Sequence, residues 1–182
     1  ILNGHKRFIT NGEVASFHTV FALTNPEKGA RSLTAFVVPT DLPGIEIKPR
    51  LEKMGQKASV QNEIIYTNVE VPAENMLGNE DHGFLIAMKT FDRTRTGVAA
   101  LSLGAARSAY EISRDWAKNR VQFGKPIAAN QAIGFMLADM ATGIEASRLL
   151  TYKAASIIDS GSRNTMYASM AKAFAADHAN KC

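Results

Sequence analysis

The sequence predicts an antiparallel β-barrel or sandwich followed by an up-down bundle of α-helices. Two observations support this fold class. Residues 1–76 contain short runs of β-branched and apolar residues separated by turn signals. From Gly83 onward, apolar residues recur instead at steps of three and four, the spacing of an amphipathic helix. We therefore expect one domain over residues 1–76 and a second over residues 77–182.

The strand-like runs are residues 1–8, 19–23, 33–38, 45–48 and 64–71. Within the first run, Asn3-Gly4 predicts a tight hairpin turn between two short strands. Asn25-Pro26, residues 41–44 and residues 54–56 are turn or loop signals between the later runs. Pro72 marks the exit from the β-region.

Three helices are expected, over residues 84–119, residues 130–159 and from residue 164 onward. The inner stripe of the second contains Ile133, Leu137, Met140, Ile144, Ala154 and Ile158. Gly97 and Gly104 in the first helix, and Gly143 in the second, predict close helix packing. No apolar stretch is long enough to span a membrane.

The first helix carries an arginine on its apolar stripe. The stripe is Phe84, Met88, Phe91, Val98, Ser102, Ala105, Ala109, Ile112 and Trp116, and Arg95 occupies the missing step. A guanidinium facing a core needs an anionic partner nearby, because burying it alone costs several kcal/mol. Asp92, three residues earlier, is the simplest partner, so the residue types favour an ion pair within the helix.

Composition limits the classes of ligand. The net charge of +4 and the pI of about 9.3 suit an anionic ligand such as a phosphorylated cofactor. Lys and Arg are scattered, which argues against a nucleic-acid surface. Cys182 is the only cysteine, so intrachain disulfides and thiolate metal sites are excluded. The four histidines are far apart and are expected to be surface or packing residues, with no metal site.

Three other segments could carry chemistry, and each has a plain structural alternative. Residues 8–12 end a strand with an aromatic ring, a hydroxyl and an amide, which suits a planar cofactor or simply a turn. Residues 120–126 and Asn130-Gln131 place arginine and a helix start together, which suits a pyrophosphate or a basic helix–helix turn. Residues 162–165 put Arg163 at a helix start, where a cap is the alternative.

The order of these segments resembles the acyl-CoA dehydrogenase family, and most of all its medium- and short-chain straight-acyl members. The resemblance rests on residues 8–12, 54–59, 71–78, 91–95, 120–126 and 131–133, and it covers essentially the whole chain. Family subunits have an N-terminal helical domain, a middle β-domain and a C-terminal four-helix domain. The resemblance implies that this chain is an internal fragment holding part of the β-domain and the first helices of the C-terminal domain.

The resemblance also implies roles for individual residues. Phe8, Ile9 and Thr10 match the segment that lines FAD, with the Thr10 hydroxyl near flavin N5; many relatives have tryptophan in place of Phe8. The matches to FAD contacts from a neighbouring subunit are Arg120, Gln122, Phe123, Asn130 and Gln131; Gln122 and Asn130 differ from the residue types of some relatives. Arg163 and Thr165 match a further FAD contact. Asp92, Thr94 and Arg95 match the segment that meets acyl-CoA, which gives a second reason for an arginine on the stripe.

The family reaction is α,β-dehydrogenation of acyl-CoA, with electrons passed to an electron-transferring flavoprotein. The glutamate base usually lies late in the C-terminal domain, and a minority of members carry it at the position of Thr94. Because Thr94 is not acidic, the resemblance implies a base beyond Cys182 and an inactive fragment. It also implies a homo-oligomer, dimeric or tetrameric, in bacterial cytoplasm or the mitochondrial matrix. An acyl-CoA oxidase or flavin monooxygenase on this fold, or a non-enzymatic scaffold, remains the alternative.

Overall fold

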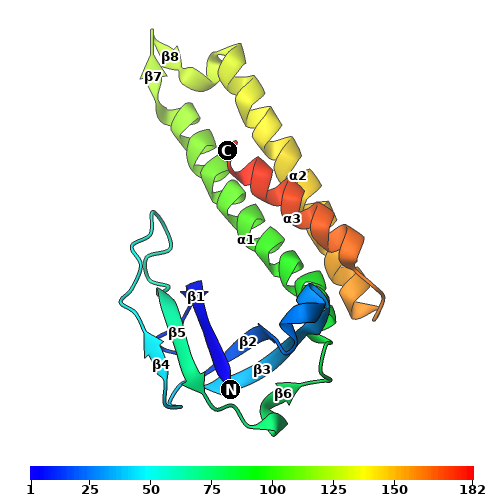
Figure 1. Cartoon of the computed structure of the whole chain (residues 1–182). Helices are drawn as coiled ribbons and strands as arrows, with labels where there is room; N and C mark the ends of the chain where they lie inside the picture. The colour runs from blue at the N-terminus through cyan, green and yellow to red at the C-terminus, as the bar shows by residue number, and fades with distance from the viewer. The chain divides into compact units, whose positions relative to one another are not determined.

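The computed structural model describes all 182 residues, which divide into two compact units, Ile1–Ala87 and Met88–Cys182. The first unit contains the strands of two three-stranded antiparallel sheets, and the second contains the helices (Figure 1). The predicted fold class is therefore confirmed, although the sheets do not close into a barrel.

In the first unit, one sheet has the order β1 (Leu2–Thr10), β5 (Gln61–Val69) and β4 (Ile45–Ile47). The other has the order β2 (Phe17–Leu23), β3 (Leu33–Pro39) and β6 (Met76–Leu77). Short 3₁₀ helices, η1 (Pro26–Ser32) and η2 (Ala73–Asn75), connect the strands. The two sheets share one core, formed by Val20, Val38, Ile64, Tyr66 and Val69.

The predicted hairpin at Asn3-Gly4 is wrong. A single strand, β1, runs through this position and pairs with β5, with a register shift between Leu2 and Gly4. Asn3 uses its side chain across the sheet: its Nδ2 donates to Asn68 Oδ1 at 3.1 Å, and its Oδ1 accepts from the Asn68 amide at 2.7 Å. A long partner strand therefore overrides the local turn preference of Asn-Gly.

Burial of Tyr66 gives the β-unit a testable dependence on alkaline pH. The side chain is 3% exposed, and burial raises the pKa of its hydroxyl to about 12 from the ordinary value of 10.0. The unfolded chain therefore loses this proton before the folded chain does. Tyr66 contributes fully to stability below pH 10, and its contribution is lost as the pH rises through about 12. Urea unfolding at pH 9 and pH 11.5 should show a larger loss of stability for the wild type than for Tyr66→Phe; an equal loss would contradict this account.

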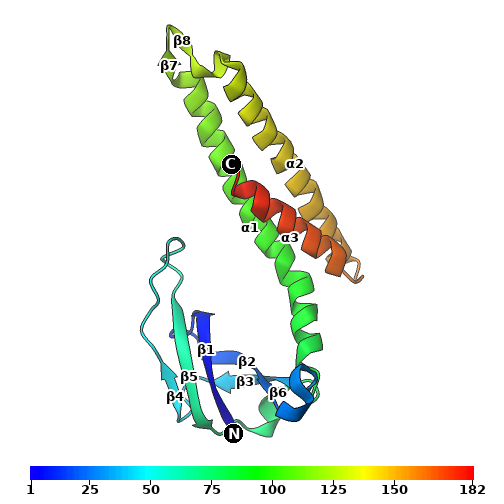
Figure 2. The same cartoon turned by 45° about the horizontal axis from the view of Figure 1, so that its top comes forward.

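The second unit consists of three helices and a small hairpin. Helix α1 (Gly83–Asn119) begins in the first unit, and α2 (Gln131–Asp159) and α3 (Thr165–Ala179) complete the bundle. Strands β7 (Val121–Gln122) and β8 (Lys125–Pro126), followed by η3 (Ile127–Ala129), join α1 to α2 (Figure 2). The three predicted helices are confirmed: both ends of the first two, and the start of the third, lie within one residue of the prediction. No helix combines the length and apolarity needed to cross a bilayer.

The predicted stripe on α1 is wrong, whereas the stripe on α2 is confirmed. Apart from Gly83 at its first position, the buried residues of α1 are Thr96, Ala99, Ala106 and Ala117, each one position after a step of the predicted series. Ala99 packs with Ala154, Ala171 and Ala175, so small side chains set the contact between the helices. The larger stripe members stay exposed, with Ile112 at 69% and Trp116 at 62%. The six predicted positions of α2 are all buried or half-buried.

The glycines of the bundle differ in their surroundings. A methyl group added at Gly97 or Gly104 would meet nothing within 4 Å, so close packing at these positions is a wrong prediction. At Gly143 the prediction is confirmed, because an added Cβ would lie 2.1 Å from His178 Cε1. His178 is held there by a 3.1 Å contact from its Nε2 to the Met140 carbonyl and by stacking on Phe174.

Candidate functional site

The end of β1 presents an aromatic ring and a hydroxyl on the surface. Phe8 has φ of 60°, a left-handed conformation that is unusual for a bulky residue, at a register shift between Lys6 and Ile9. Its ring is 61% exposed. Ile9 packs against the core, while Thr10 is exposed at the strand end. Phe8 and Thr10 are thus both exposed, on either side of the half-buried Ile9.

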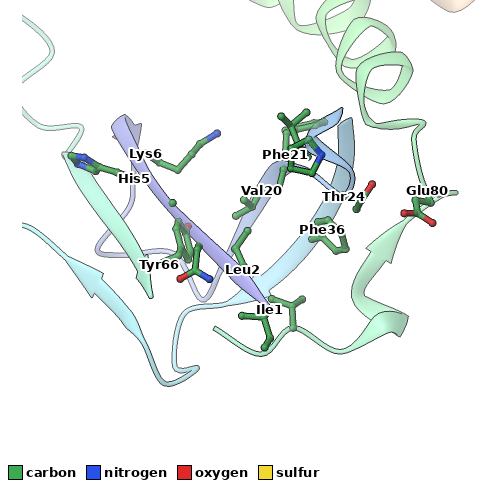
Figure 3. Close-up of a pocket in the computed structure, with 16 residues that line it drawn as sticks. Ile1, Leu2, His5, Lys6, Val20, Phe21, Thr24, Phe36, Tyr66 and Glu80 are labelled. Atoms are coloured by element: carbon green, nitrogen blue, oxygen red, sulfur yellow. The ribbon is translucent and has the colours of Figure 1, made fainter. Parts of the chain in front are cut away.

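A cavity of about 780 Å³ lies elsewhere in the β-unit, between β1 and β2 (Figure 3). Its lining includes Leu2, Val20, Phe36 and Tyr66, with Lys6 and Glu80 as charged members. Phe8, Ile9 and Thr10 do not line it. The predicted flavin-lining segment is therefore a separate surface.

The β7–β8 hairpin holds a fully displayed aromatic residue at its tip. Phe123 is 99% exposed, and it and Gly124 have φ of 50° and 77°, as in the two-residue turns typical of tight hairpins. The Arg120 carbonyl accepts from the Ile127 amide at 2.9 Å, which closes the loop. The segment, for which the sequence left a pyrophosphate site and a basic helix–helix turn as alternatives, contains a short hairpin, on which Gln122 pairs with Lys125.

Helix α2 begins directly after this hairpin. Asn130 precedes the first helical residue, Gln131, and its side chain makes no capping hydrogen bond. The first N–H groups of the helix therefore remain available to an anionic group. Arg120, Gln122, Phe123, Asn130 and Gln131 all lie at this one end of the bundle. The arrangement suits a phosphate beside a planar ring.

A second cluster joins α1 to the start of α3. Thr165 Oγ1 donates to Asp92 Oδ2 at 2.6 Å, and Arg163 Nε donates to Thr165 Oγ1 at 3.1 Å. Asn164 is 3% exposed, and its Nδ2 donates to the Asp92 carbonyl at 3.2 Å and to Thr96 Oγ1 at 3.4 Å. The predicted flavin segment 163–165 and the predicted acyl-CoA segment 92–95 are therefore directly connected.

Arg95 does not form the ion pair that its spacing favours. Its Nη1 instead donates to Ser169 Oγ on α3 at 3.3 Å, and its guanidinium lies 5.4 Å from the Phe91 ring centroid. Asp92 is engaged by Thr165. A half-buried arginine with a neutral partner keeps most of its charge available to an anionic ligand. Thr94, next to it, is exposed.

Asn164 is a member of this cluster that sequence reasoning missed. Its Oδ1 is the one buried side-chain oxygen or nitrogen without a hydrogen-bond partner. Its position before α3 reads as an ordinary N-cap, yet the side chain makes no cap bond and reaches α1 instead. No signal in the sequence distinguishes these two uses of the same residue type.

The Thr165–Asp92 hydrogen bond supports a stability prediction. Thr165→Val keeps the shape of the side chain but leaves a half-buried carboxylate without its donor, which should cost about 1.5–3 kcal/mol of unfolding free energy. Thr142→Val, at an exposed position of α2, is the control and should change it by less than about 0.5 kcal/mol. Urea titration measures both; equal changes in the two variants would show that the bond adds nothing.

Comparison with known proteins identifies the family. Residues 1–69 match the acyl-CoA dehydrogenase middle domain, and residues 81–182 match the acyl-CoA dehydrogenase C-terminal domain. The chain belongs to the acyl-CoA dehydrogenase family. This is a family of FAD-dependent oxidoreductases.

Individual relatives agree with this assignment. An acyl-CoA dehydrogenase of Bacillus subtilis is 49% identical over 181 residues, which is 100% of this chain and 48% of the relative. The CarC subunit of the caffeyl-CoA reductase-Etf complex of Acetobacterium woodii is 44% identical over 181 residues, 100% of this chain and 48% of the relative. The structure of butyryl-CoA dehydrogenase from Megasphaera elsdenii matches with a TM-score of 0.93 and 46% identity, over 97% of this chain and 46% of that chain. The chain thus spans about half the length of these relatives.

Proposed function

We propose that the whole protein is an FAD-dependent acyl-CoA dehydrogenase that converts acyl-CoA thioesters to trans-2-enoyl-CoA. The observation that carries the proposal is the cluster between α1 and α3. There, the segment matching an acyl-CoA contact and the segment matching an FAD contact share the Thr165–Asp92 hydrogen bond. Family membership over both domains supports the same reading.

The surface residues described above fit FAD. Phe8 and Thr10 would face the flavin ring, with the Thr10 hydroxyl as a hydrogen-bond donor and Ile9 anchoring the strand beneath. Arg120 and the uncapped N–H groups at the start of α2 would meet the pyrophosphate, and the exposed Phe123 would lie beside an adjacent ring. When bound, FAD supplies a hydride acceptor; the residues of this chain bind and orient it.

The FAD-matching residues of the second unit lie near opposite ends of α2, which supports a homo-oligomer. Gln131 begins this helix, and Arg163 lies four residues after its last residue, Asp159. Twenty-nine helical residues span about 43 Å, so one cofactor does not reach both ends. In a dimer or tetramer, each end would meet the FAD of a different copy.

Arg95 and Thr94 would meet the acyl-CoA. The guanidinium lies 5.4 Å from the centroid of the Phe91 ring and offers further N–H donors beyond the one bound to Ser169. Thr94 carries no carboxyl group, so the base that removes the α proton would lie outside these 182 residues. Electron transfer to an electron-transferring flavoprotein is part of the proposal, supported by the name of the CarC relative.

Flavin spectroscopy tests this proposal. The 182-residue chain alone should bind FAD weakly, and added acyl-CoA should leave the visible flavin band unchanged. Tight stoichiometric FAD binding with bleaching by acyl-CoA would show that a base lies within this chain. In the whole protein, rapid reoxidation of the reduced flavin by oxygen would identify an oxidase instead of a dehydrogenase.

A further inference from the structure

A buried histidine lies directly behind the turn that follows Thr10. His18, on β2, is 7% exposed, and its Nε2 lies 3.0 Å from the Gly12 carbonyl oxygen. Its Nδ1 lies 2.9 Å from the hydroxyl of Tyr66 on β5, which is 3% exposed. The imidazole thus connects the two sheets and the turn, although nothing in the proposed chemistry uses it.

The partners fix the tautomer of His18. A carbonyl oxygen only accepts, so Nε2 carries the proton and donates to Gly12. Nδ1 of the neutral ring then has a lone pair and accepts from the Tyr66 hydroxyl. In this tautomer, both ring nitrogens and the phenol hydroxyl each have a hydrogen-bond partner.

The other side of the turn is held just as closely. A Cβ added at Gly12 would lie 3.1 Å from Asn62 Cβ, so the backbone presses against this fully buried side chain. Asn62 accepts from the Glu13 amide at 3.1 Å and donates to the Glu13 carboxylate at 3.0 Å. The Asn62 amide and the Arg50 guanidinium hold the pKa of Glu13 below its usual value.

These contacts leave the turn little freedom. Asn11 has φ of 61°, and its carbonyl accepts from the amides of Val14 and Ala15 at 3.2 and 3.0 Å. Thr10 immediately precedes Asn11, so its orientation depends on where Gly12 is held. Thr10 pairs with Gln61 on β5, and the Asn11 amide donates to the Val60 carbonyl at 2.9 Å, so the strand end and the turn are held as one unit.

We propose that His18 is a positioning residue, which with Tyr66 fixes the Gly12 carbonyl and thereby the Thr10 hydroxyl at the flavin. The inference rests on the proposed function for the presence of the flavin. Its geometric part, the support of the turn, rests on contacts within the β-unit alone. Neither His18 nor Tyr66 touches the cofactor in this account.

Side-chain length provides the matched variants. In His18→Gln, an amide nitrogen occupies the ε position and can still donate to the Gly12 carbonyl; in His18→Asn, the amide is one atom too short. Tyr66→Phe removes only the hydroxyl and keeps the shape of the core, so it tests the same contact in a variant that should still fold. These three variants are to be made in the whole protein with FAD bound.

The FAD dissociation constant and the visible flavin spectrum are the readouts, with the thermal midpoint as the stability reference. One lost hydrogen bond corresponds to about a fivefold change in affinity. We expect His18→Asn to bind FAD about fivefold more weakly with a shifted spectrum. Tyr66→Phe and His18→Gln both lose the contact between residues 18 and 66 but keep the donor to the Gly12 carbonyl, so each should bind FAD no more than about threefold more weakly. Exchange of the Val14 and Ala15 amides should quicken in His18→Asn and not in His18→Gln.

Equal FAD affinity and spectra in His18→Asn and His18→Gln would overturn the inference, whatever their thermal midpoints. Unchanged amide exchange in His18→Asn would overturn it as well. If the wild-type whole protein bound no FAD, the proposed function and the role of His18 at the flavin would both fail. Wild-type FAD binding with indistinguishable variants would refute the role of His18 alone.

Discussion

Replacing Arg95 by glutamine in the whole protein should weaken acyl-CoA binding by about 10- to 100-fold. The guanidinium is half-buried, and it donates a hydrogen bond to a neutral hydroxyl, Ser169 Oγ, and forms no ion pair with a carboxylate. A charge-assisted hydrogen bond contributes about 1.5–3 kcal/mol, and each 1.4 kcal/mol is a factor of ten in affinity. Titration of the FAD-loaded protein with an unreactive acyl-CoA analogue, followed by calorimetry, measures the change.

Arg93→Gln is the matched control for this prediction. It removes the same charge from the same turn of α1, but Arg93 is exposed and makes no ion pair. Its affinity should remain within about twofold of the wild type, because exposed charges are largely screened. Equal losses in the two variants would show that net charge, and not a contact at Arg95, attracts the ligand.

Replacing Gly143 by alanine should lower the free energy of unfolding by about 2 kcal/mol. The new Cβ would lie 2.1 Å from His178 Cε1 and 2.3 Å from Nδ1, so the ring or the helix must move. The ring cannot swing away without losing its contact with the Met140 carbonyl and its stacking on Phe174. Urea unfolding followed by circular dichroism measures the loss.

Two further variants isolate the cause. Gly134→Ala lies in the same helix with nothing within 4 Å, and it should stabilise the chain by up to about 1 kcal/mol through helix propensity. His178→Ala removes the ring that the new methyl group would meet. In that background, adding Gly143→Ala should therefore lower the free energy of unfolding by much less than it does in the wild type. A loss that persists in this background would place its origin elsewhere.

The helices were predictable from the sequence because their signals are local. Helix α2 could be placed to within one residue from the helical spacing of its apolar residues, with Asn130 before the helix and Gly161 after it. The face that α1 buries was not predictable in the same way. The largest side chains suggested the stripe through Trp116, but Ala99 and its alanine neighbours on α2 and α3 form the contact. Which face is buried depends on the partner helices, and that information lies far away in the sequence.

In the candidate site, too, local features were predictable from the sequence and distant partners were not. Residue types placed Arg95 and Asp92 on one side of α1, and proximity in sequence favoured pairing them. The structure gives each a partner on α3, Ser169 and Thr165, more than 70 residues away. The roles of Phe8, Thr10 and Phe123 come from resemblance alone, whereas the two exposed rings lie at left-handed backbone positions that no periodicity reveals.

We propose that the whole protein oxidises acyl-CoA at a flavin held by these segments. The most direct measurement is an anaerobic titration of the FAD-loaded whole protein with butyryl-CoA, with analysis of the thioester products. We expect bleaching of the visible flavin band, with one trans-2-enoyl-CoA formed for each flavin reduced. A flavin band that stays unchanged under a series of acyl-CoA chain lengths, with no enoyl product, would contradict it.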